Sequence, residues 1–167
     1  MLDVKDFNAV ATDEIIAEIN LWNQKVTVVL CIELDEDEED EKLYIKKAQK
    51  FIEKNIKRIN NKIEYLESIK DKILDDVMKQ NPIQTVQMYI ENRLDNSMEN
   101  YYTLNDSTEV KLPLTESDFL EKLLICESVD LEIDAIDDEE EPRIVVTVSF
   151  GVKDGLAGGH GWDVEIE

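Results

Sequence analysis

The spacing of apolar residues changes twice along this chain, and each change marks a different kind of element. Apolar residues occupy every second position over 14–22 and again over 25–34, with Asn23 and Gln24 between the two runs. This alternation predicts a β-hairpin with Trp22 on its first strand. Alternation returns over 129–135, 144–150 and 162–166, which predicts three further strands, the last of them containing Trp162.

Between these strands, apolar residues recur every three or four positions from 42 to 79, and lysines fill the other positions. This pattern predicts a strongly amphipathic helix. A straight helix of this length would extend about 57 Å, whereas a compact domain of this size is only about 40 Å across. We therefore expect helix 42–79 either to break near Asn60 and Asn61 or to project as an arm that pairs with another helix.

The order of strands, helices and strands predicts the fold class. Asn81 and Pro82 form a helix-start signature, so we expect a second helix over 82–97. The segment 100–114 is polar and irregular, and Thr115 with Asp118 resembles a capping box before a short helix. We predict one α+β domain over 1–167, in which long helices pack on one face of an antiparallel sheet of about five strands.

Charge is distributed unevenly, and this restricts the class of partner. Residues 1–41 hold 13 acidic and 2 basic residues, 42–81 hold 6 and 11, and 82–167 hold 21 and 5, giving a net charge of −22. Such an excess of negative charge repels nucleic acid and anionic membranes. The first ten residues lack a basic segment followed by an apolar run, so we expect a cytoplasmic protein whose partner is a basic protein.

The alternation in the C-terminal strands predicts a candidate partner-binding site. If the apolar residues face the helices, six carboxylates share the opposite face: Asp130, Glu132, Asp134, Asp163, Glu165 and Glu167. Like charges on neighbouring strands destabilise a sheet by about 0.2 to 1 kcal/mol per opposed pair. Two interpretations stay open, namely a solvated face that protects edge strands from aggregation and a docking surface for a basic partner.

Motifs that would indicate catalysis or metal binding are weak. The acidic run 35–41 would begin a calcium loop, but Asp40 and Lys46 stand where such a loop needs Gly and Glu, and the run 137–141 fails in the same way. We therefore predict no metal and no cofactor. Cys31 and Cys126 lie in apolar segments typical of buried thiols.

Four of the five glycines and the only histidine lie between residues 153 and 162. Glycines at this density indicate a sharply turning backbone. We predict a structural turn that includes Gly158, Gly159, His160 and Gly161, in which His160 forms structural hydrogen bonds. An enzyme that uses His160, with one of the cysteines and Asp163, is the alternative.

The stretch 114–123, the following strand and hairpin, and Gly159 with His160 before a last strand together resemble a bacterial family, domain of unknown function 2262. Trp22 with its following strand and the lysine-rich helix also suit that pattern. The resemblance implies no reaction or cofactor, but it implies a similarity to immunity proteins that neutralise toxins.

These observations predict a non-enzymatic acidic binding protein, an immunity or inhibitor protein that masks a basic bacterial toxin surface with its acidic sheet face. Two alternatives stay open. One is the enzyme that uses His160, and the other is a scaffold protein that forms homo-oligomers through the helix 42–79.

Overall fold

A computed structural model describes residues 1–9, 14–33, 41–95, 98–134 and 141–166 of the chain. The chain forms two compact units. Unit 1 contains Met1–Lys70, Ser128–Val148 and Glu165–Glu167, and unit 2 contains Asp71–Glu127 and Ser149–Val164. The predicted α+β class is confirmed, whereas the number of domains stays a prediction.

The predicted N-terminal hairpin is present in unit 1. Strand β2 (Glu14–Leu21) pairs antiparallel with β3 (Gln24–Glu33). The turn consists of Trp22 and Asn23, both with positive φ (51° and 62°), which is the backbone of a type I′ turn. Trp22 therefore lies in the turn and not on a strand, because the strand pairing already ends at Leu21 with Gln24.

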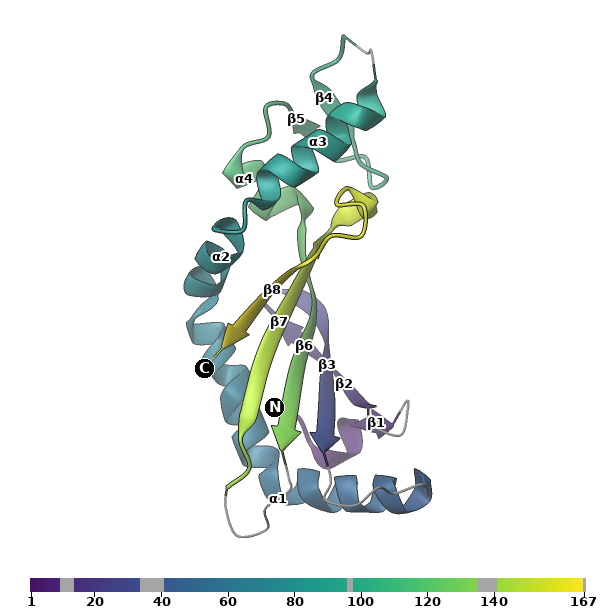
Figure 1. Cartoon of the computed structure of the whole chain (residues 1–167), viewed down its shortest axis with the longest axis vertical. Coiled ribbons are helices and arrows are strands. Elements are labelled where there is room, and N and C mark those ends of the chain that lie inside the picture. Colours follow the sequence, from purple (N-terminus) through teal and green to yellow (C-terminus); the bar gives the residue numbers. More distant parts are fainter. Residues whose placement is uncertain (10–13, 34–40, 96–97, 135–140, 167) are drawn as a thin grey trace. The chain divides into compact units, whose positions relative to one another are not determined.

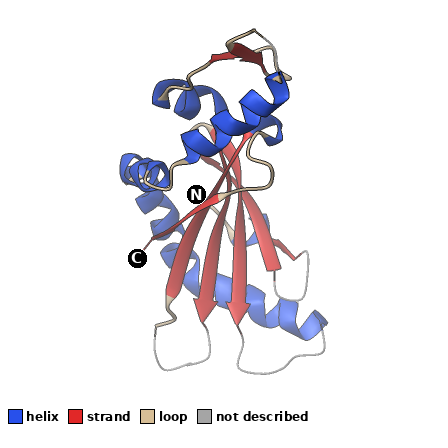
Figure 2. Cartoon of the chain, turned by 45° about the horizontal axis from the view of Figure 1, so that its top comes forward, coloured by secondary structure: helices blue, strands red, loops and turns tan. Residues whose placement is uncertain are grey.

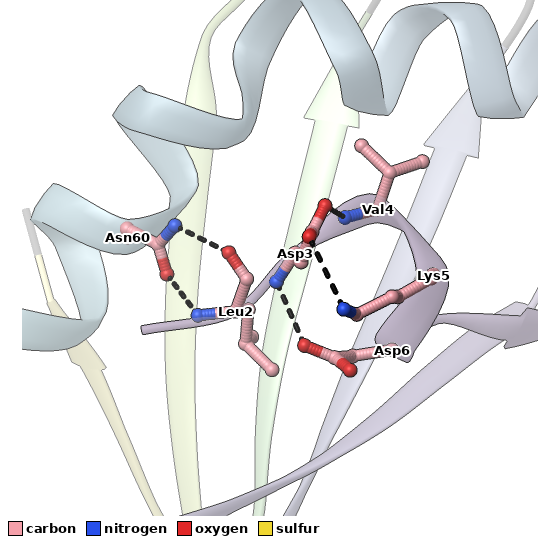
Figure 3. Close-up of polar contacts among 6 residues, drawn as sticks. All are labelled: Leu2, Asp3, Val4, Lys5, Asp6 and Asn60. Atoms are coloured by element: carbon pink, nitrogen blue, oxygen red, sulfur yellow. Dashed lines mark hydrogen bonds and ion pairs between the residues drawn. The ribbon is translucent and has the colours of Figure 1, made fainter.

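The lysine-rich segment forms helix α1 (Glu41–Ser68), followed by α2 (Lys70–Met78). The interruption lies at Ile69, where the amide donates to the carbonyl of Leu66 three residues back, so the prediction of a break near Asn60 is wrong. Asn60 has a different role (Figure 3). Its side chain accepts a hydrogen bond from the Leu2 amide and donates one to the Leu2 carbonyl, each at 2.9 Å.

Helix α1 packs along one face of the unit 1 part of the sheet, so it is not a projecting arm. Tyr44 Oη donates to the carbonyl of Ile32 (3.4 Å), and Arg58 Nη2 donates to the carbonyl of Pro142 (2.9 Å). In Figure 2 the helix passes behind the strands. Its apolar side is buried in this contact, and the residues less than 2% exposed are Ala48, Ile52, Ile59 and Leu66.

In unit 2, helix α3 (Pro82–Leu94) begins where Asn81 and Pro82 predict. Asn81 adopts a left-handed backbone (φ 55°), and its side chain forms no capping hydrogen bond. Thr115 does cap: its hydroxyl accepts from the Asp118 amide at 3.1 Å, at the start of α4 (Glu116–Asp118). One turn of π-helix (Phe119–Leu123) follows directly.

The segment predicted to be irregular contains a short hairpin of β4 (Tyr101–Thr103) and β5 (Glu109–Lys111). Each strand has only three residues, which is too short for alternation to reveal. Short 3₁₀ turns occur at Val4–Asp6 and Lys153–Gly155.

The main sheet has six strands in the order β1-β2-β3-β6-β7-β8 (Figure 1). The strands not yet introduced are β1 (Asn8–Ala9), β6 (Leu124–Asp134), β7 (Ile144–Val152) and β8 (Trp162–Ile166). The prediction of a purely antiparallel sheet is wrong, because β3 and β6 are parallel. The connection between these two strands contains α1, α2 and α3 and is long enough for the crossover that a parallel pair requires.

Candidate functional site

The face of the sheet that points away from α1 carries three of the predicted acidic residues, Asp130, Glu132 and Glu165. We call it the outer face, and alternate strand residues form it: Glu14, Ile16 and Glu18 (β2), Thr27, Val29 and Cys31 (β3), Ser128, Asp130 and Glu132 (β6), Val145 and Thr147 (β7) and Glu165 (β8).

Strand register arranges these side chains in rows across the outer face. Ile16 lies opposite Val29, and Val29 lies opposite Asp130. In the adjacent row, Glu14 and Glu132 lie on either side of a cysteine. Both glutamates are exposed, whereas Ile16, Val29 and Asp130 are half-buried. The outer face therefore has an apolar centre next to exposed carboxylates.

The two acidic strands predicted from the sequence, β6 and β8, are not neighbours in this sheet. Strand β7 lies between β6 and β8, and its outer residues Val145 and Thr147 are uncharged. On the other side of β6, Asp130 faces Val29. The carboxylates of β6 and β8 are thus separated by a neutral strand, so repulsion between these two strands is no longer an argument for a cationic partner. One acidic pair remains in the register of β3 with β6, where Glu33 is the partner of Asp134.

The six predicted acidic residues differ in burial and in the unit to which they belong. Asp130 is half-buried and accepts a hydrogen bond from the Ser128 hydroxyl at 3.2 Å, while Glu132 and Glu165 are exposed. Asp163 belongs to unit 2, where it is exposed and its carbonyl accepts from Gln80 Nε2 at 3.1 Å. The side chain of Asp134 and all of Glu167 lie outside the described residues, as do the runs 35–40 and 137–140.

The glycine-rich segment adopts the sharply turning backbone that the sequence predicts. Gly158 and Gly159 have φ of 56° and 87°, values that other residues rarely adopt. A Cβ atom on Gly158 would overlap the Tyr89 ring, so this position also needs glycine for close approach. Gly161 lies close to the Phe150 carbonyl, 3.3 Å from an ideal Cβ position.

His160 is exposed at the end of this turn. Its amide donates to the Ala157 carbonyl at 2.9 Å, and its ring centroid lies 6.3 Å from that of Tyr89. The structural role of the His160 side chain stays a prediction.

The cysteines differ from each other in their surroundings. Cys126 is buried, and this burial, together with the negative charge of Glu127, raises the pKa of its thiol to about 12. A thiol with this pKa stays protonated at neutral pH and is not a nucleophile. Cys31 is half-buried on the outer face, not in the core. The enzyme alternative therefore loses Cys126 as its nucleophile.

A polar network in unit 2 has no counterpart in the sequence predictions. Asp154 has φ of 60°; its carboxylate accepts from the Asn105 amide (2.7 Å) and its carbonyl accepts from Arg93 Nη2 (3.0 Å). Beside it, hydrogen bonds from Thr108 and then from Lys153 lower the pKa of Asp106 to about 2. These contacts tie the β4–β5 hairpin to the turn at 153–155.

Lys153 also belongs to this network, since it forms an ion pair of 3.2 Å with Asp106. A signal in the sequence could have pointed to the loop that takes part in the network. The sequence Asn105, Asp106 and Ser107 is typical of a turn, and it lies between the two short strands.

Two surface hollows lie outside the outer face. One, of about 580 Å³ in unit 1, is lined by Asn20, Trp22, Asn23, Glu67 and Lys70. The other, of about 610 Å³ in unit 2, is lined by residues of 78–91 that include Met78 and Met88. His160 lines neither of these two hollows.

Among the described residues, no group of three or more His, Cys, Asp or Glu side chains is arranged to hold a metal ion. In the same part of the chain, no helix is both long and apolar enough to span a membrane. Comparisons with protein-family models, curated proteins and solved structures find no match to this chain. The resemblance to domain of unknown function 2262 therefore stays a prediction.

Proposed function

We propose that this protein is a non-enzymatic binding protein whose outer face recognises a basic protein surface, as an immunity or inhibitor protein does when it masks a toxin. The observation that carries the proposal is the arrangement of Ile16 and Val29 beside the exposed carboxylates of Glu14 and Glu132, on the face that α1 leaves open. An apolar centre with a charged rim is the usual anatomy of a protein–protein interface.

The two kinds of residue contribute differently to such an interface. Exposed ion pairs stabilise a complex by only about 0.2 to 1 kcal/mol each, so the carboxylates mainly accelerate association and select a partner of positive charge. Most of the affinity must come from the apolar centre, where burial contributes about 25 cal/mol per Å². The net charge of −22 favours the same class of partner.

Glu18 is the carboxylate of the outer face that already has a cationic neighbour. Lys25 Nζ lies 3.8 Å from Glu18 Oε2, and both side chains are more than 70% exposed. A long, exposed pair of this kind is weak, so a partner cation can replace Lys25 at little cost.

The proposal is tested by binding to cytochrome c, used here as a basic probe protein, at ionic strengths from about 0.05 to 0.5 M. The neutral-face variant replaces three carboxylates of the outer face: Glu14→Gln, Glu18→Gln and Glu132→Gln. The control variant makes the same charge change on exposed acids of unit 2: Asp71→Asn, Asp75→Asn and Glu121→Gln.

We expect the neutral-face variant to bind the probe about threefold to about 150-fold more weakly than the control variant, as three exposed ion pairs imply, and we expect added salt to reduce this difference. Equal weakening in the two variants would mean that the probe responds to net charge alone. That outcome would refute the assignment of binding to the outer face.

A further inference from the structure

The exposed side of α1 carries a row of positive charge on a protein that is otherwise strongly acidic. We call it the lysine stripe, and it consists of Lys46, Lys50, Lys54 and Lys57. All four are exposed, and their spacing of three or four positions places them on one side of the helix. One acidic residue, Glu53, lies among them.

The described residues do not neutralise the lysine stripe. Within the described part of the chain, no carboxylate forms an ion pair with any of its four ammonium groups. Arg58, by contrast, is engaged, since it contacts the Pro142 carbonyl and lies 3.8 Å from a carboxylate oxygen of Glu141. The stripe is therefore a cationic surface open to a partner.

Pairing of α1 with the α1 of another copy does not fit this helix. Its apolar side, which includes Ile52 and Ile59, is buried against its own sheet, so a coiled-coil seam is not open to a partner. Two exposed lysine stripes would also repel each other. A homo-oligomer that uses the stripe must therefore set it against a surface of opposite charge.

The outer face of unit 1 is such a surface, and its dimensions match those of the stripe. The stripe covers eleven residue steps, or about 17 Å of helix. On the outer face, Glu14 and Glu18 are four residues apart along β2, or about 13 Å, and Glu132 lies two strand spacings from Glu14, or about 10 Å. Helix α1 and the outer face lie on opposite sides of the same sheet.

We propose that the lysine stripe of one copy docks on the carboxylates of the outer face of a second copy. The inference rests on the outer face of the proposed function, with another copy as the basic partner. Because the two surfaces differ and lie on opposite sides of unit 1, the contact is head-to-tail and each copy offers both halves of it.

Two physical consequences follow from this arrangement. The association continues from copy to copy, so no fixed stoichiometry is expected. It is also weak and reversible, because exposed ion pairs are weak and copies of charge −22 repel each other. At about 0.15 M salt this repulsion is screened beyond about 8 Å, whereas the stripe and the face meet at contact distance.

The test is sedimentation velocity of the full chain at increasing protein concentration, in about 0.15 M and about 1 M salt. Three variants carry charge reversals of equal size at exposed positions. The stripe variant is Lys46→Glu, Lys50→Glu and Lys54→Glu. The face variant is Glu14→Lys, Glu18→Lys and Glu132→Lys. The control variant is Lys70→Glu, Lys72→Glu and Lys111→Glu.

In about 0.15 M salt we expect the wild type and the control variant to sediment faster as concentration rises, and we expect about 1 M salt to abolish this effect. The stripe variant and the face variant should each remain monomeric. Their equimolar mixture should associate again, because the normal stripe of the face variant meets the normal face of the stripe variant. This recovery also shows that both variants are folded.

The proposal is overturned if the wild type is monomeric at every concentration, if the stripe variant associates like the wild type, or if the mixture fails to recover. Binding of the monomeric wild type, but not of the stripe variant, to duplex DNA or to phosphatidylserine vesicles would assign the stripe to another polyanion instead. The stripe variant should still bind cytochrome c, so loss of self-association leaves the proposed function intact.

Discussion

Replacement of Asn60 by alanine should release the N-terminal segment from α1. The side chain forms two hydrogen bonds of 2.9 Å with the backbone of Leu2, as Figure 3 shows. Each hydrogen bond contributes about 0.5 to 1.5 kcal/mol, so their loss removes about 1 to 3 kcal/mol. Alanine also has a higher helix propensity than asparagine, which returns about 0.5 kcal/mol.

Asn61→Ala is a matched control for this change. Asn61 is the exposed neighbour on the same helix, so its replacement carries the same gain in helix propensity. It does not remove the two hydrogen bonds between Asn60 and Leu2, which we call the clamp. The free energy of unfolding in urea should therefore be about 1 to 3 kcal/mol lower for Asn60→Ala than for Asn61→Ala.

Hydrogen exchange gives an independent local readout of the same change. Leu2 is a buried residue, 8% exposed, and its amide should lose its protection in Asn60→Ala and keep it in Asn61→Ala. Equal stability and equal exchange in the two variants would refute the clamp.

Three further predictions concern unit 2. The pKa of Asp106 in the folded protein lies near 2, below its ordinary 3.8. The stability that its carboxylate contributes is therefore complete above about pH 4 and is lost as the pH falls through 2. In Asp106→Asn, the free energy of unfolding in urea should lack this dependence on pH. Gly158→Ala should lower the thermal midpoint more than Gly159→Ala, because both have positive φ but only Gly158 lies against Tyr89; an equal shift would contradict the close approach. In a variant with Cys126 as its only cysteine, a thiol reagent should react in guanidinium and not with the native protein, and native labelling at neutral pH would contradict the burial and the pKa of about 12.

The elements that sequence periodicity located correctly are those whose side chains alternate between core and solvent. The strands β2, β3, β7 and β8 and the amphipathic side of α1 were predictable because burial on one side dictates a repeat of two or of 3.6 residues. The parallel pairing of β3 with β6 was not, because alternation is the same in parallel and antiparallel neighbours when one side of each strand is exposed.

Some local details could not be predicted because a side chain forms a hydrogen bond with a backbone group far away in the sequence. Asn60 reads as a helix breaker, yet it bonds to Leu2, fifty-eight residues away in sequence. The same holds for Asp154, which accepts from Asn105 across forty-nine residues. Contacts of this range depend on the tertiary fold, and no local pattern records them.

The candidate site was predictable in composition and not in arrangement. Alternation correctly placed Glu132 and Glu165 on the side of the sheet opposite the core. The intervening neutral strand β7 and the contribution of Glu14 depend on strand order, which alternation does not specify. The sequence therefore suggested acidic strands, whereas the structure shows an apolar centre with carboxylates beside it.

The measurement that most directly tests the role of the outer face is a titration of the ¹⁵N-labelled chain with unlabelled cytochrome c, followed by amide chemical shifts. The proposal predicts that the largest changes fall on β2, β3 and β6, at Glu14, Val29 and Glu132. Changes concentrated on α2 and α3, with those three amides unaffected, would contradict it.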